Sequence, residues 1–565
     1  MLLPLLIVIP LLCAGLIVFN PREQARYIAA GGSLLSVVLG VAALMAFDWS
    51  KGGTDQLNFI MDWVPSLGLQ MSLGTDSVSL LLIALTILLG PICIIGSFSA
   101  IKEHQKTYYA WLLILQSAMI GVFCARDLVL FYICFEFTLV PMYILIAMFG
   151  SSNRRNASTK FFLYTFTGSV IALAGFAYVA WQHSMLAGQW SFDMAELGAT
   201  ARSMNLHQQS WVLLALMAGF AVKVPLFPVH TWLPLAHTEA PTAGSVILAG
   251  VLLKLGTYGV YKFALPFAPA AVLDYAPFMA VLAIIGIVYA GLICWVQTDI
   301  KKLVAYSSVS HLGFCMLGLF AVNSVGVTGS VLYMLNHGLS TGALFLMIGM
   351  MYERYHTRSM KEVGGLGSHM PIWSCFMVFF VMASVGLPGL NGFVSEIMCL
   401  VGTFQSGPWT GEAGATPGGT FGTLGPVYAA LAGLGMIVAA MYLLYMTGKI
   451  VWGEYREPEG HHEHEELPKD LNAREIGVLI PLALGCLIFG LFPAPLMKAI
   501  EEPVNDTIAY VNAYNVDGTG RHTEWVHVEH ANHDDHADDH AHDNGHDDGH
   551  GDHADDSHSE EDEGH

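Results

Sequence analysis

Residues 220–234 read FAVKVPLFPVHTWLP, an apolar stretch that contains Lys223 and three prolines, Pro225, Pro228 and Pro234. A helix that crosses lipid normally avoids both features, because a buried ammonium is costly and proline removes a backbone donor. Irregular backbone at membrane depth is tolerated only where it is buried in protein or lines a hydrated cavity. The stretch therefore predicts a broken membrane helix with a cation at the break, which is how transporters build ion sites.

The composition of the chain is that of a membrane protein. Of its 565 residues, 54% are hydrophobic and 12% are charged, and the mean hydropathy is +0.54, far from the balance of a soluble domain. The formal net charge of −21 is concentrated near the end, because residues 522–565 hold 16 Asp and Glu, 12 of the 24 His, and no Lys or Arg. The rest of the chain carries −5, so the acidity does not indicate a basic partner, and no nucleic-acid binding is expected.

Fourteen apolar runs are long enough to cross a bilayer, which takes about 20 residues. No alternating strand pattern is evident and the runs are too long for barrel strands, so we predict an all-α polytopic membrane protein with about fourteen transmembrane helices. The first run lacks the basic start and the cleavage site of a signal peptide and is predicted to be retained. The runs are 1–19, 27–47, 77–100, 108–125, 128–150, 159–182, 210–229, 240–262, 276–297, 303–322, 325–352, 371–403, 425–452 and 475–496.

The distribution of Lys and Arg predicts the orientation, because these residues favour short cytoplasmic loops. The odd-numbered connections between the runs carry 16 basic residues, whereas the even-numbered connections and the tail carry 6. We therefore predict that both termini lie on the outer side of the membrane. Basic residues at the ends of runs are counted with the connections, and of the 24 basic residues two remain deep inside predicted spans, Lys223 and Lys254.

Six ionisable side chains stand deep inside predicted spans, and an ionised group at mid-bilayer costs at least about 2.5–3.5 kcal/mol. They are Lys223, Lys254, Glu136, Glu396, His311 and His337. Such a set predicts a chain of groups that pass protons. Simpler interpretations stay open: the lysines snorkel to the interface, the glutamates form a static ion pair or a protonated hydrogen bond, and the histidines are satisfied by a neighbouring helix.

A second break is predicted at GLPGLNGF, residues 386–393, directly before Glu396. It interrupts the twelfth run, as the prolines after Lys223 interrupt the seventh, and each break has one ionisable residue beside it. Two such breaks five spans apart predict an internal repeat, and the odd offset requires the two copies to be inverted in the membrane. The alternative is that the prolines are only packing kinks.

Three segments resemble the antiporter-like subunits of respiratory complex I: FEFTLVPMYILIAMFG (135–150), KVPLFPVHTWLPLAHTEAPTAGSVILAGVLLKLGTYGVYKF (223–263) and TDIKKLVAYSSVSHLGF (298–314). The resemblance covers residues 60–490 and is strongest to the M type. Two features separate the chain from its siblings. Glu396 stands where the L and N types usually carry lysine, and the chain stops after about fourteen spans without the long lateral helix of the L type.

The resemblance implies an architecture and a site. It implies three helices in 1–107, two inverted five-helix repeats at 108–262 and 276–452 with broken helices 7 and 12, and a last loop and helix in 453–499. In the first half, Glu136 and Lys223 match the family's carboxylate–lysine pair. The other site residues that the resemblance implies are the central Lys254, the exit carboxylate Glu396, the linking His311 and His337, and His230 and His237 near the seventh span.

The function implied is that of a proton-translocating membrane subunit of NADH:quinone oxidoreductase in a bacterial inner membrane, with L-type and N-type subunits and lipid as partners. The nine cysteines include no CxxC pair and no strand–GxGxxG–helix unit is evident, so no cofactor, metal or redox centre is expected in this chain. NADH, FMN, iron–sulfur clusters and quinone are expected in other subunits. Two alternatives stay open: a cation/proton antiporter or membrane-bound hydrogenase subunit of the same superfamily, and a non-transporting scaffold.

Residues 500–565 form an acidic, His-rich segment without apolar periodicity, and we predict a disordered, solvated tail that no family motif covers. The alternative is a weak site for zinc, nickel or copper, since imidazoles and carboxylates bind these metals. The same two interpretations apply to EGHHEHEEL, residues 459–467, in the last odd-numbered connection.

Overall fold

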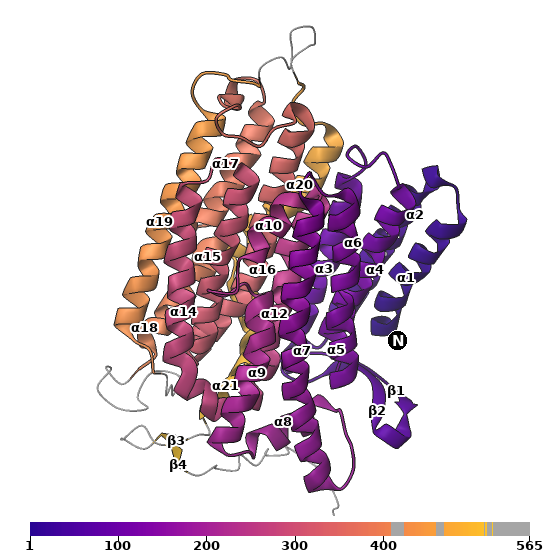
Figure 1. Ribbon diagram of the computed structural model, residues 1–565, viewed down its shortest axis with the longest axis vertical. Coiled ribbons are helices and arrows are strands. Elements are labelled where there is room, and N and C mark those ends of the chain that lie inside the picture. The colour runs from indigo at the N-terminus through magenta and orange to yellow at the C-terminus, as the bar shows by residue number, and fades with distance from the viewer. Residues whose placement is uncertain (408–422, 459–467, 513–514, 517–521, 524–565) are drawn as a thin grey trace, which may run out of the picture. The chain divides into compact units, whose positions relative to one another are not determined.

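The computed structural model describes residues 1–407, 423–458, 468–512, 515–516 and 522–523. The EGHHEHEEL segment and nearly all of the acidic tail lie outside these residues. The described part is a bundle of helices that run side by side (Figure 1). Its principal helices are α1 (Leu2–Phe19), α2 (Ala25–Ala46), α3 (Ser77–Gly96), α4 (Gln105–Cys124), α5 (Leu128–Phe137), α6 (Leu139–Phe149), α7 (Arg154–Ala187), α9 (Leu206–Lys223), α10 (Trp232–Glu239), α11 (Thr242–Ile247), α12 (Leu253–Gly259), α13 (Leu265–Phe267), α14 (Pro269–Trp295), α15 (Ile300–Phe320), α16 (Ser324–Tyr355), α17 (Pro371–Val385), α18 (Asn391–Gln405), α19 (Pro426–Val451) and α20 (Ala473–Leu491).

Short polar side chains fix where several of these helices begin. Asp76, Asp127 and Asp299 each accept a hydrogen bond from a backbone N–H in the first turn of α3, α5 and α15. Asn205 and Asn472 do the same for α9 and α20, and each forms a capping box with the residue three positions on. These caps satisfy donors that a helix start leaves without intrahelical partners.

Twelve helical segments among the described residues are long and apolar enough to cross a membrane. They correspond to every predicted run except the seventh and the twelfth. The seventh run ends in non-helical backbone after α9, and α10 begins beyond it, at Trp232. The twelfth run is divided between α17 and α18, with non-helical backbone in between. The helical membrane architecture is therefore confirmed, while the exact count of fourteen and the inverted repeats stay predictions.

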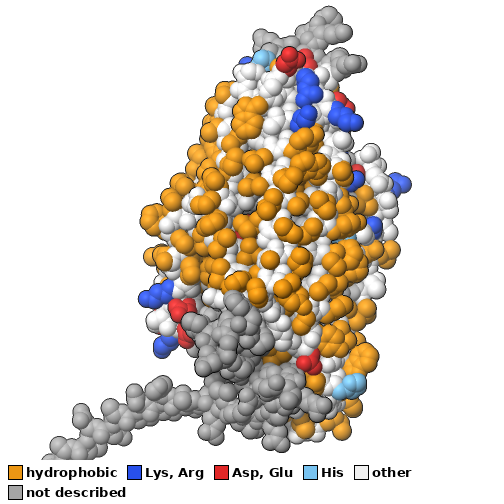
Figure 2. Space-filling view, turned by 90° about the vertical axis from the view of Figure 1, so that its left-hand side faces the viewer, with side chains coloured by type: hydrophobic (Ala, Val, Ile, Leu, Met, Phe, Trp, Pro, Cys, Tyr) orange, Lys and Arg blue, Asp and Glu red, His pale blue; other side chains and the backbone are white. Residues whose placement is uncertain are grey.

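The outer faces of α14 and α19 carry the apolar surface expected for contact with lipid. Figure 2 shows hydrophobic side chains over the middle of this side of the molecule and charged ones toward its two ends. The exposed residues recur every three or four positions, which places them on one helix face: Phe278, Val281, Ile285, Tyr289 and Leu292 on α14, and Val427, Leu431, Leu434, Ile437 and Met441 on α19.

The connections gather at two opposite ends in alternation. Odd-numbered connections contact one another: Ser151 N–H donates to the Glu239 carbonyl, and Ile300 N–H to that of Arg358. At the other end, Arg126 N–H donates to the Ser72 carbonyl and Met194 N–H to that of Arg126. We call the second end the hairpin end, because it carries strands β1 (Gln56–Val64) and β2 (Leu69–Thr75).

The β1–β2 hairpin was not predicted from the sequence. The two strands pair antiparallel, with Met61 opposite Met71. Ile60, Met61 and Trp63 are all exposed, so neither face of β1 is fully buried. Period-two alternation arises only where one face is buried, which is why this hairpin left no signal in the sequence.

Two further helices at the hairpin end were not predicted, α8 (Met194–Arg202) and α21 (Ala494–Asn512). Residues 500–512 therefore belong to a helix, and the predicted start of a disordered tail at residue 500 was too early. The buried face of α21 consists of Ile500, Val504, Ile508 and Val511, which recur at helical spacing. The charged residues between them lower the mean hydropathy of the segment, so its composition alone did not indicate a helix.

Candidate functional site

The first break follows Lys223, the last residue of α9. Pro225 has no N–H to donate to the Ala221 carbonyl, and Leu226 N–H occupies that acceptor at 2.8 Å. The Val222 carbonyl, left without its own helical donor, accepts a hydrogen bond from the Trp232 indole at 2.9 Å. The freed backbone acceptors are therefore satisfied inside the protein, as a break at membrane depth requires.

The Lys223 side chain is buried and points into the bundle. Its Nζ donates to the Phe135 carbonyl at 3.4 Å and to Thr138 Oγ1 at 3.3 Å, and it lies 4.0 Å from the centroid of the Phe135 ring. A carbonyl, a hydroxyl and an aromatic face each compensate part of an ammonium charge. Snorkelling to the interface is thereby contradicted for Lys223.

Glu136 lies between Phe135 and Phe137 near the end of α5. Although Phe135 and Thr138 both contact Lys223, Glu136 forms no ion pair with Lys223 within 4.0 Å. The carboxylate is half-buried, and its Oε1 has no hydrogen-bond partner. The structure thus places Glu136 and Lys223 on neighbouring segments, but their side chains do not form an ion pair. The interpretation of Glu136 and Lys223 as a closed static ion pair is therefore contradicted.

Lys254 lies in α12 between two π-helical segments, Leu248–Leu252 and Val260–Ala264. Such wide turns are uncommon and often occur at functional sites. The side chain is fully buried, and its Nζ contacts the Ala249 carbonyl and lies 2.7 Å from His337 Nδ1. Snorkelling is contradicted here too, because the ammonium points to another side chain in the core.

His337 leads from Lys254 toward a second imidazole. When Lys254 donates to Nδ1 of His337, a neutral His337 carries its hydrogen on Nε2, and that nitrogen has no partner in the structure. The His337 and His311 ring centroids are 6.0 Å apart. A proton would cross this gap by a ring rotation or a bridging water, because the rings are too far apart for a direct hydrogen bond.

Glu396 completes this line of contacts. Its Oε1 accepts from the Tyr333 hydroxyl at 2.5 Å and lies 3.3 Å from His311 Nδ1. His311 Nδ1 is also 2.7 Å from the Tyr333 oxygen, and the Tyr442 hydroxyl lies 3.5 Å from His311 Nε2. Lys254, His337, His311 and Glu396 are thus brought together in one buried row.

The second break makes room for Glu396. Gly386 ends α17 with φ +82°, and a Cβ there would lie 2.6 Å from Glu396 Oε2. Glycine is needed both for the left-handed backbone and for the close approach. Asn336 on α16 and Asn391 at the start of α18 each donate to the other's backbone carbonyl, at 2.8 and 3.1 Å, which fixes the break against α16.

His230 and His237 are buried but stand apart from this row. The His230 ring stacks on Phe227 at 5.8 Å in the segment between α9 and α10. The His237 ring stacks on Phe345 of α16 at 4.7 Å, and neither of its nitrogens has a hydrogen-bond partner. The structure therefore joins neither histidine by a hydrogen bond to Lys223 or to Lys254.

Sequence reasoning missed several participants. Tyr333 stands four residues before His337, a spacing that puts both on one helix face, so the YMLNH motif held a usable signal. Thr138 and Tyr442 had none, because a single hydroxyl in an apolar run is common. Lys301, counted with the loops, is buried at the start of α15, where its Nζ donates to the Ala240 carbonyl at 2.5 Å.

Fold and site together define an antiporter-like membrane protein. Two interrupted helices each carry an ionisable side chain at the break, and a buried lysine and two histidines lie between them. A family model described as NADH:quinone oxidoreductase/Mrp antiporter matches residues 125–416, and one described as the amino terminus of NADH-ubiquinone oxidoreductase chain 4 matches residues 53–122. The chain belongs to the family of NADH-quinone oxidoreductase subunit M and NADH-ubiquinone oxidoreductase chain 4.

Individual relatives agree with this assignment. The chain is 37% identical to NADH-ubiquinone oxidoreductase chain 4 of Marchantia polymorpha over 508 residues, 89% of this chain and 96% of the relative. It is 37% identical to NADH-quinone oxidoreductase subunit M of Rhodobacter capsulatus over 505 residues, 88% of this chain and 92% of the relative. In the structure of respiratory complex I from Thermus thermophilus with bound NADH, one chain matches with a TM-score of 0.77 and 27% identity, covering 90% of this chain and 100% of that one.

Proposed function

We propose that this chain is a proton-translocating membrane subunit of an NADH:quinone oxidoreductase. The observation that carries the proposal is the buried row Lys254–His337–His311–Glu396, in which each group can hold and release a proton. Groups of this kind, spaced by hydrogen bonds and one short gap, pass protons without binding another substrate. Because the chain belongs to the subunit M family, we infer that the proton movement is coupled to the NADH:quinone oxidoreductase reaction.

Lys223 and Glu136 form the input side of the proposed path. The Lys223 ammonium is held by neutral partners only, at 3.3 and 3.4 Å. Its charge is therefore sensitive to where the nearby Glu136 carboxylate stands, because a carboxylate that approaches favours the ammonium and one that withdraws favours the amine. Movement of Glu136 would load or unload Lys223, and the released proton would continue through Lys254.

The proton steps on the other side balance simply. Lys254 Nζ gives a proton to His337 Nδ1, which leaves a neutral amine and an imidazolium. His337 gives up the proton on Nε2 toward His311, and His311 passes one on to Glu396, directly or through the Tyr333 hydroxyl. Glu396 then releases it. We place His230 and His237 at the margin of this path as candidates that neighbouring water could connect.

The electron chemistry belongs to other subunits in this proposal. Among the described residues, no group of three or more His, Cys, Asp or Glu is arranged to hold a metal ion. NADH, FMN, iron–sulfur clusters and quinone would be bound elsewhere in the complex. The neighbours would be L-type and N-type antiporter-like subunits in a bacterial inner membrane, with both termini outside. The tail and residues 459–467 have no assigned role in it.

The test is Lys254→Met, which keeps the length of the side chain and removes the ammonium. In assembled complex we expect NADH-driven quinone reduction and proton pumping to fall together, because a stalled proton step holds back coupled electron transfer. Lys498→Met, which removes an exposed lysine from α21, is the matched control and should change neither. A Lys254→Met complex that pumps normally would favour the scaffold alternative. A second experiment purifies the native complex and identifies its subunits. Flavin and iron–sulfur subunits that copurify with the chain and oxidise NADH would exclude an antiporter or a hydrogenase.

A further inference from the structure

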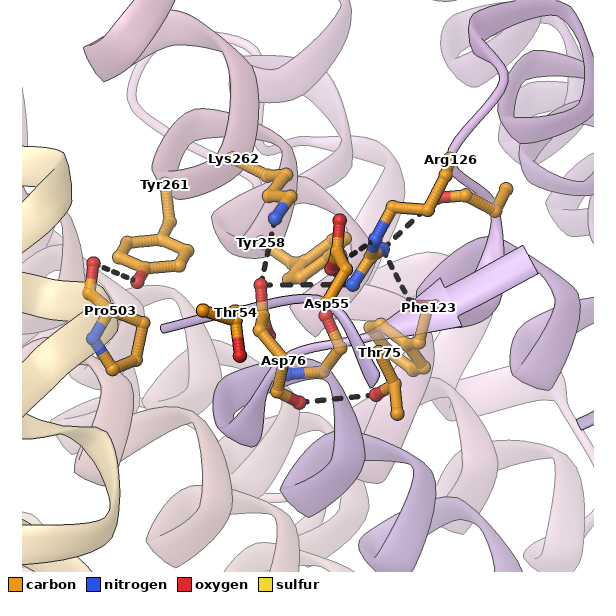
Figure 3. A network of polar contacts seen from close by, with 12 residues as sticks. Thr54, Asp55, Thr75, Asp76, Phe123, Arg126, Tyr258, Tyr261, Lys262 and Pro503 are labelled. Atoms are coloured by element: carbon orange, nitrogen blue, oxygen red, sulfur yellow. Dashed lines mark hydrogen bonds and ion pairs between the residues drawn. The ribbon is translucent and has the colours of Figure 1, made fainter. Parts of the chain in front are cut away.

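A second group of charges lies at the hairpin end, outside the row just described. Asp55 precedes β1, Asp76 caps α3, Arg126 joins α4 to α5, and Lys262 lies in the second π-helical segment. Figure 3 shows Lys262 and Arg126 converging on Asp76. Lys262 Nζ lies 2.7 Å from Asp76 Oδ2, and Arg126 Nε lies 2.5 Å from Asp55 Oδ1. We call these four residues the hairpin-end cluster.

The two buried charges of this cluster, on Asp76 and Arg126, are fixed. The Asp76 and Arg126 side chains are only 3% and 7% exposed, whereas Asp55 is 41% exposed and reaches the surface. Burial alone would raise the pKa of Asp76, but Lys262 and Arg126 outweigh it and hold that pKa below the ordinary value. Burial likewise opposes the charge of Arg126, and Asp55 leads the groups that keep its pKa above the ordinary value. Neither side chain exchanges a proton near neutral pH.

The cluster stands at the end of the helical run that carries Lys254. Lys262 follows Lys254 by eight residues, about 12 Å of helical rise. Tyr258 lies midway and is buried, with its hydroxyl 2.9 Å from Ser79 Oγ and its ring packed edge-on against Phe123 at 5.1 Å. Tyr258 and then Lys262 of the cluster thus lie along this helical run between Lys254 and the hairpin end.

We propose that the hairpin-end cluster is a fixed-charge seal, which prevents protons from passing directly between Lys254 and the hairpin-end surface. The inference rests on the proposed function, since a seal matters only where Lys254 carries protons. A relay needs groups that accept and release a proton, and the cluster offers only locked ion pairs. With this direction closed, the proton on Lys254 goes to His337, and the energy of the pump is not lost to a short circuit.

The test is Lys262→Met in the intact complex, reconstituted into liposomes. Without Lys262, the buried Asp76 loses its nearest cation and its pKa should rise, and each unit of rise makes protonated Asp76 about tenfold more abundant. Under a potassium diffusion potential and without NADH, we expect passive proton conductance to rise by up to about tenfold. With NADH, quinone reduction should continue at or above the wild-type rate while the proton gradient becomes smaller.

Two further variants distinguish a cluster that blocks protons from one that only holds the loops together. Asp76→Asn added to Lys262→Met should return the conductance to the wild-type level, because asparagine still accepts the Ser79 N–H at the cap but holds no mobile proton. Lys51→Met removes an exposed charge from the same loop and should leave the membrane tight. Lys262→Gln, which keeps a donor for Asp76, takes the place of Lys262→Met should the latter not assemble.

Several results would overturn the seal. They are a tight, fully coupled Lys262→Met complex, a leak that Asp76→Asn does not reduce, or a parallel loss of reduction and pumping in assembled complex. Failure of the proposed function itself would show elsewhere, in normal pumping by Lys254→Met, and the conductance measurement needs no redox reaction.

Discussion

The two helix breaks hold their ionisable residues in opposite ways. At the first, Lys223 has a carbonyl, a hydroxyl and an aromatic ring as partners, all neutral and none closer than 3.3 Å. At the second, Glu396 has the Tyr333 hydroxyl at 2.5 Å and His311 at 3.3 Å. Lys223 therefore makes only weak contacts, whereas Glu396 is held by short contacts to groups that can themselves exchange protons.

The contrast indicates different tasks for the two halves. A charge with weak partners responds strongly to a nearby carboxylate, because little else compensates it. Glu136 is such a carboxylate, half-buried and without a partner for Oε1. A carboxylate with strong partners keeps its position and serves as a station of defined geometry. We expect the first break to act as the responsive element and the second as the fixed terminus, and substitutions at the two should behave differently.

The largest effect is expected at the fixed terminus. Glu396→Gln keeps the shape and the hydrogen bonds to Tyr333 but cannot hold a mobile proton. Loss of a group that transfers protons typically slows a reaction by about 10²–10⁴-fold, so pumping and quinone reduction should fall by about 10²-fold or more. Proton uptake by membrane vesicles, measured together with NADH oxidation, gives both rates.

Glu396→Asp is the matched variant, because it keeps a carboxyl on a shorter stem. It should retain more activity than Glu396→Gln, although its oxygen no longer reaches both Tyr333 and His311. Equal activity of the two variants would reduce Glu396 to a hydrogen-bonding residue and remove the contrast between the breaks.

A smaller but sharper effect is expected at the responsive element. Lys223→Arg keeps a cation, and a structural cation would accept it, but guanidinium stays protonated in proteins and cannot unload when Glu136 withdraws. We expect about a tenfold loss of coupled activity, the factor by which one pKa unit changes the ratio of protonated to deprotonated groups. Wild-type rates in assembled Lys223→Arg complex would mean that the lysine only holds helices together.

Much of this contrast could be predicted from the sequence, and the limits have physical causes. Pro225 and Gly386 marked both breaks, because proline and glycine act locally on the backbone. The buried charges were visible as charges in apolar runs. The distance between Glu136 and Lys223 was not predictable, since it depends on how α5 packs against α9. The β1–β2 hairpin was missed because both of its faces are partly exposed, and the hairpin-end cluster because its residues are up to 207 positions apart, Asp55 to Lys262.

Tyr333→Phe should have a moderate effect at the fixed terminus. It removes the hydroxyl between His311 and Glu396 but leaves their direct contact at 3.3 Å. A hydrogen bond to a charged group is worth about 1.5–3 kcal/mol, so part of the geometry of Glu396 should be lost and coupled activity should fall by a few-fold to about tenfold. The solvent isotope effect on pumping should increase, because the proton transfer becomes more rate-limiting. An unchanged isotope effect with full activity would show that the tyrosine is outside the path.

The smallest effect is expected for Tyr442→Phe, which serves as the control for the preceding change. The Tyr442 hydroxyl lies 3.5 Å from His311 Nε2, at the limit of a hydrogen bond and on the nitrogen that faces away from Glu396. Such a long contact adds little free energy, and the ring of phenylalanine fills the same buried space. Activity should stay within about twofold of the wild type and the isotope effect should not change, because a neutral hydrogen bond at the limit of its range contributes at most the low end of the usual range, about 0.5 kcal/mol, which corresponds to about twofold. If Tyr442→Phe impaired pumping as much as Tyr333→Phe, the proton would leave His311 through Nε2 toward α19, and Glu396 would not be the terminus of the row.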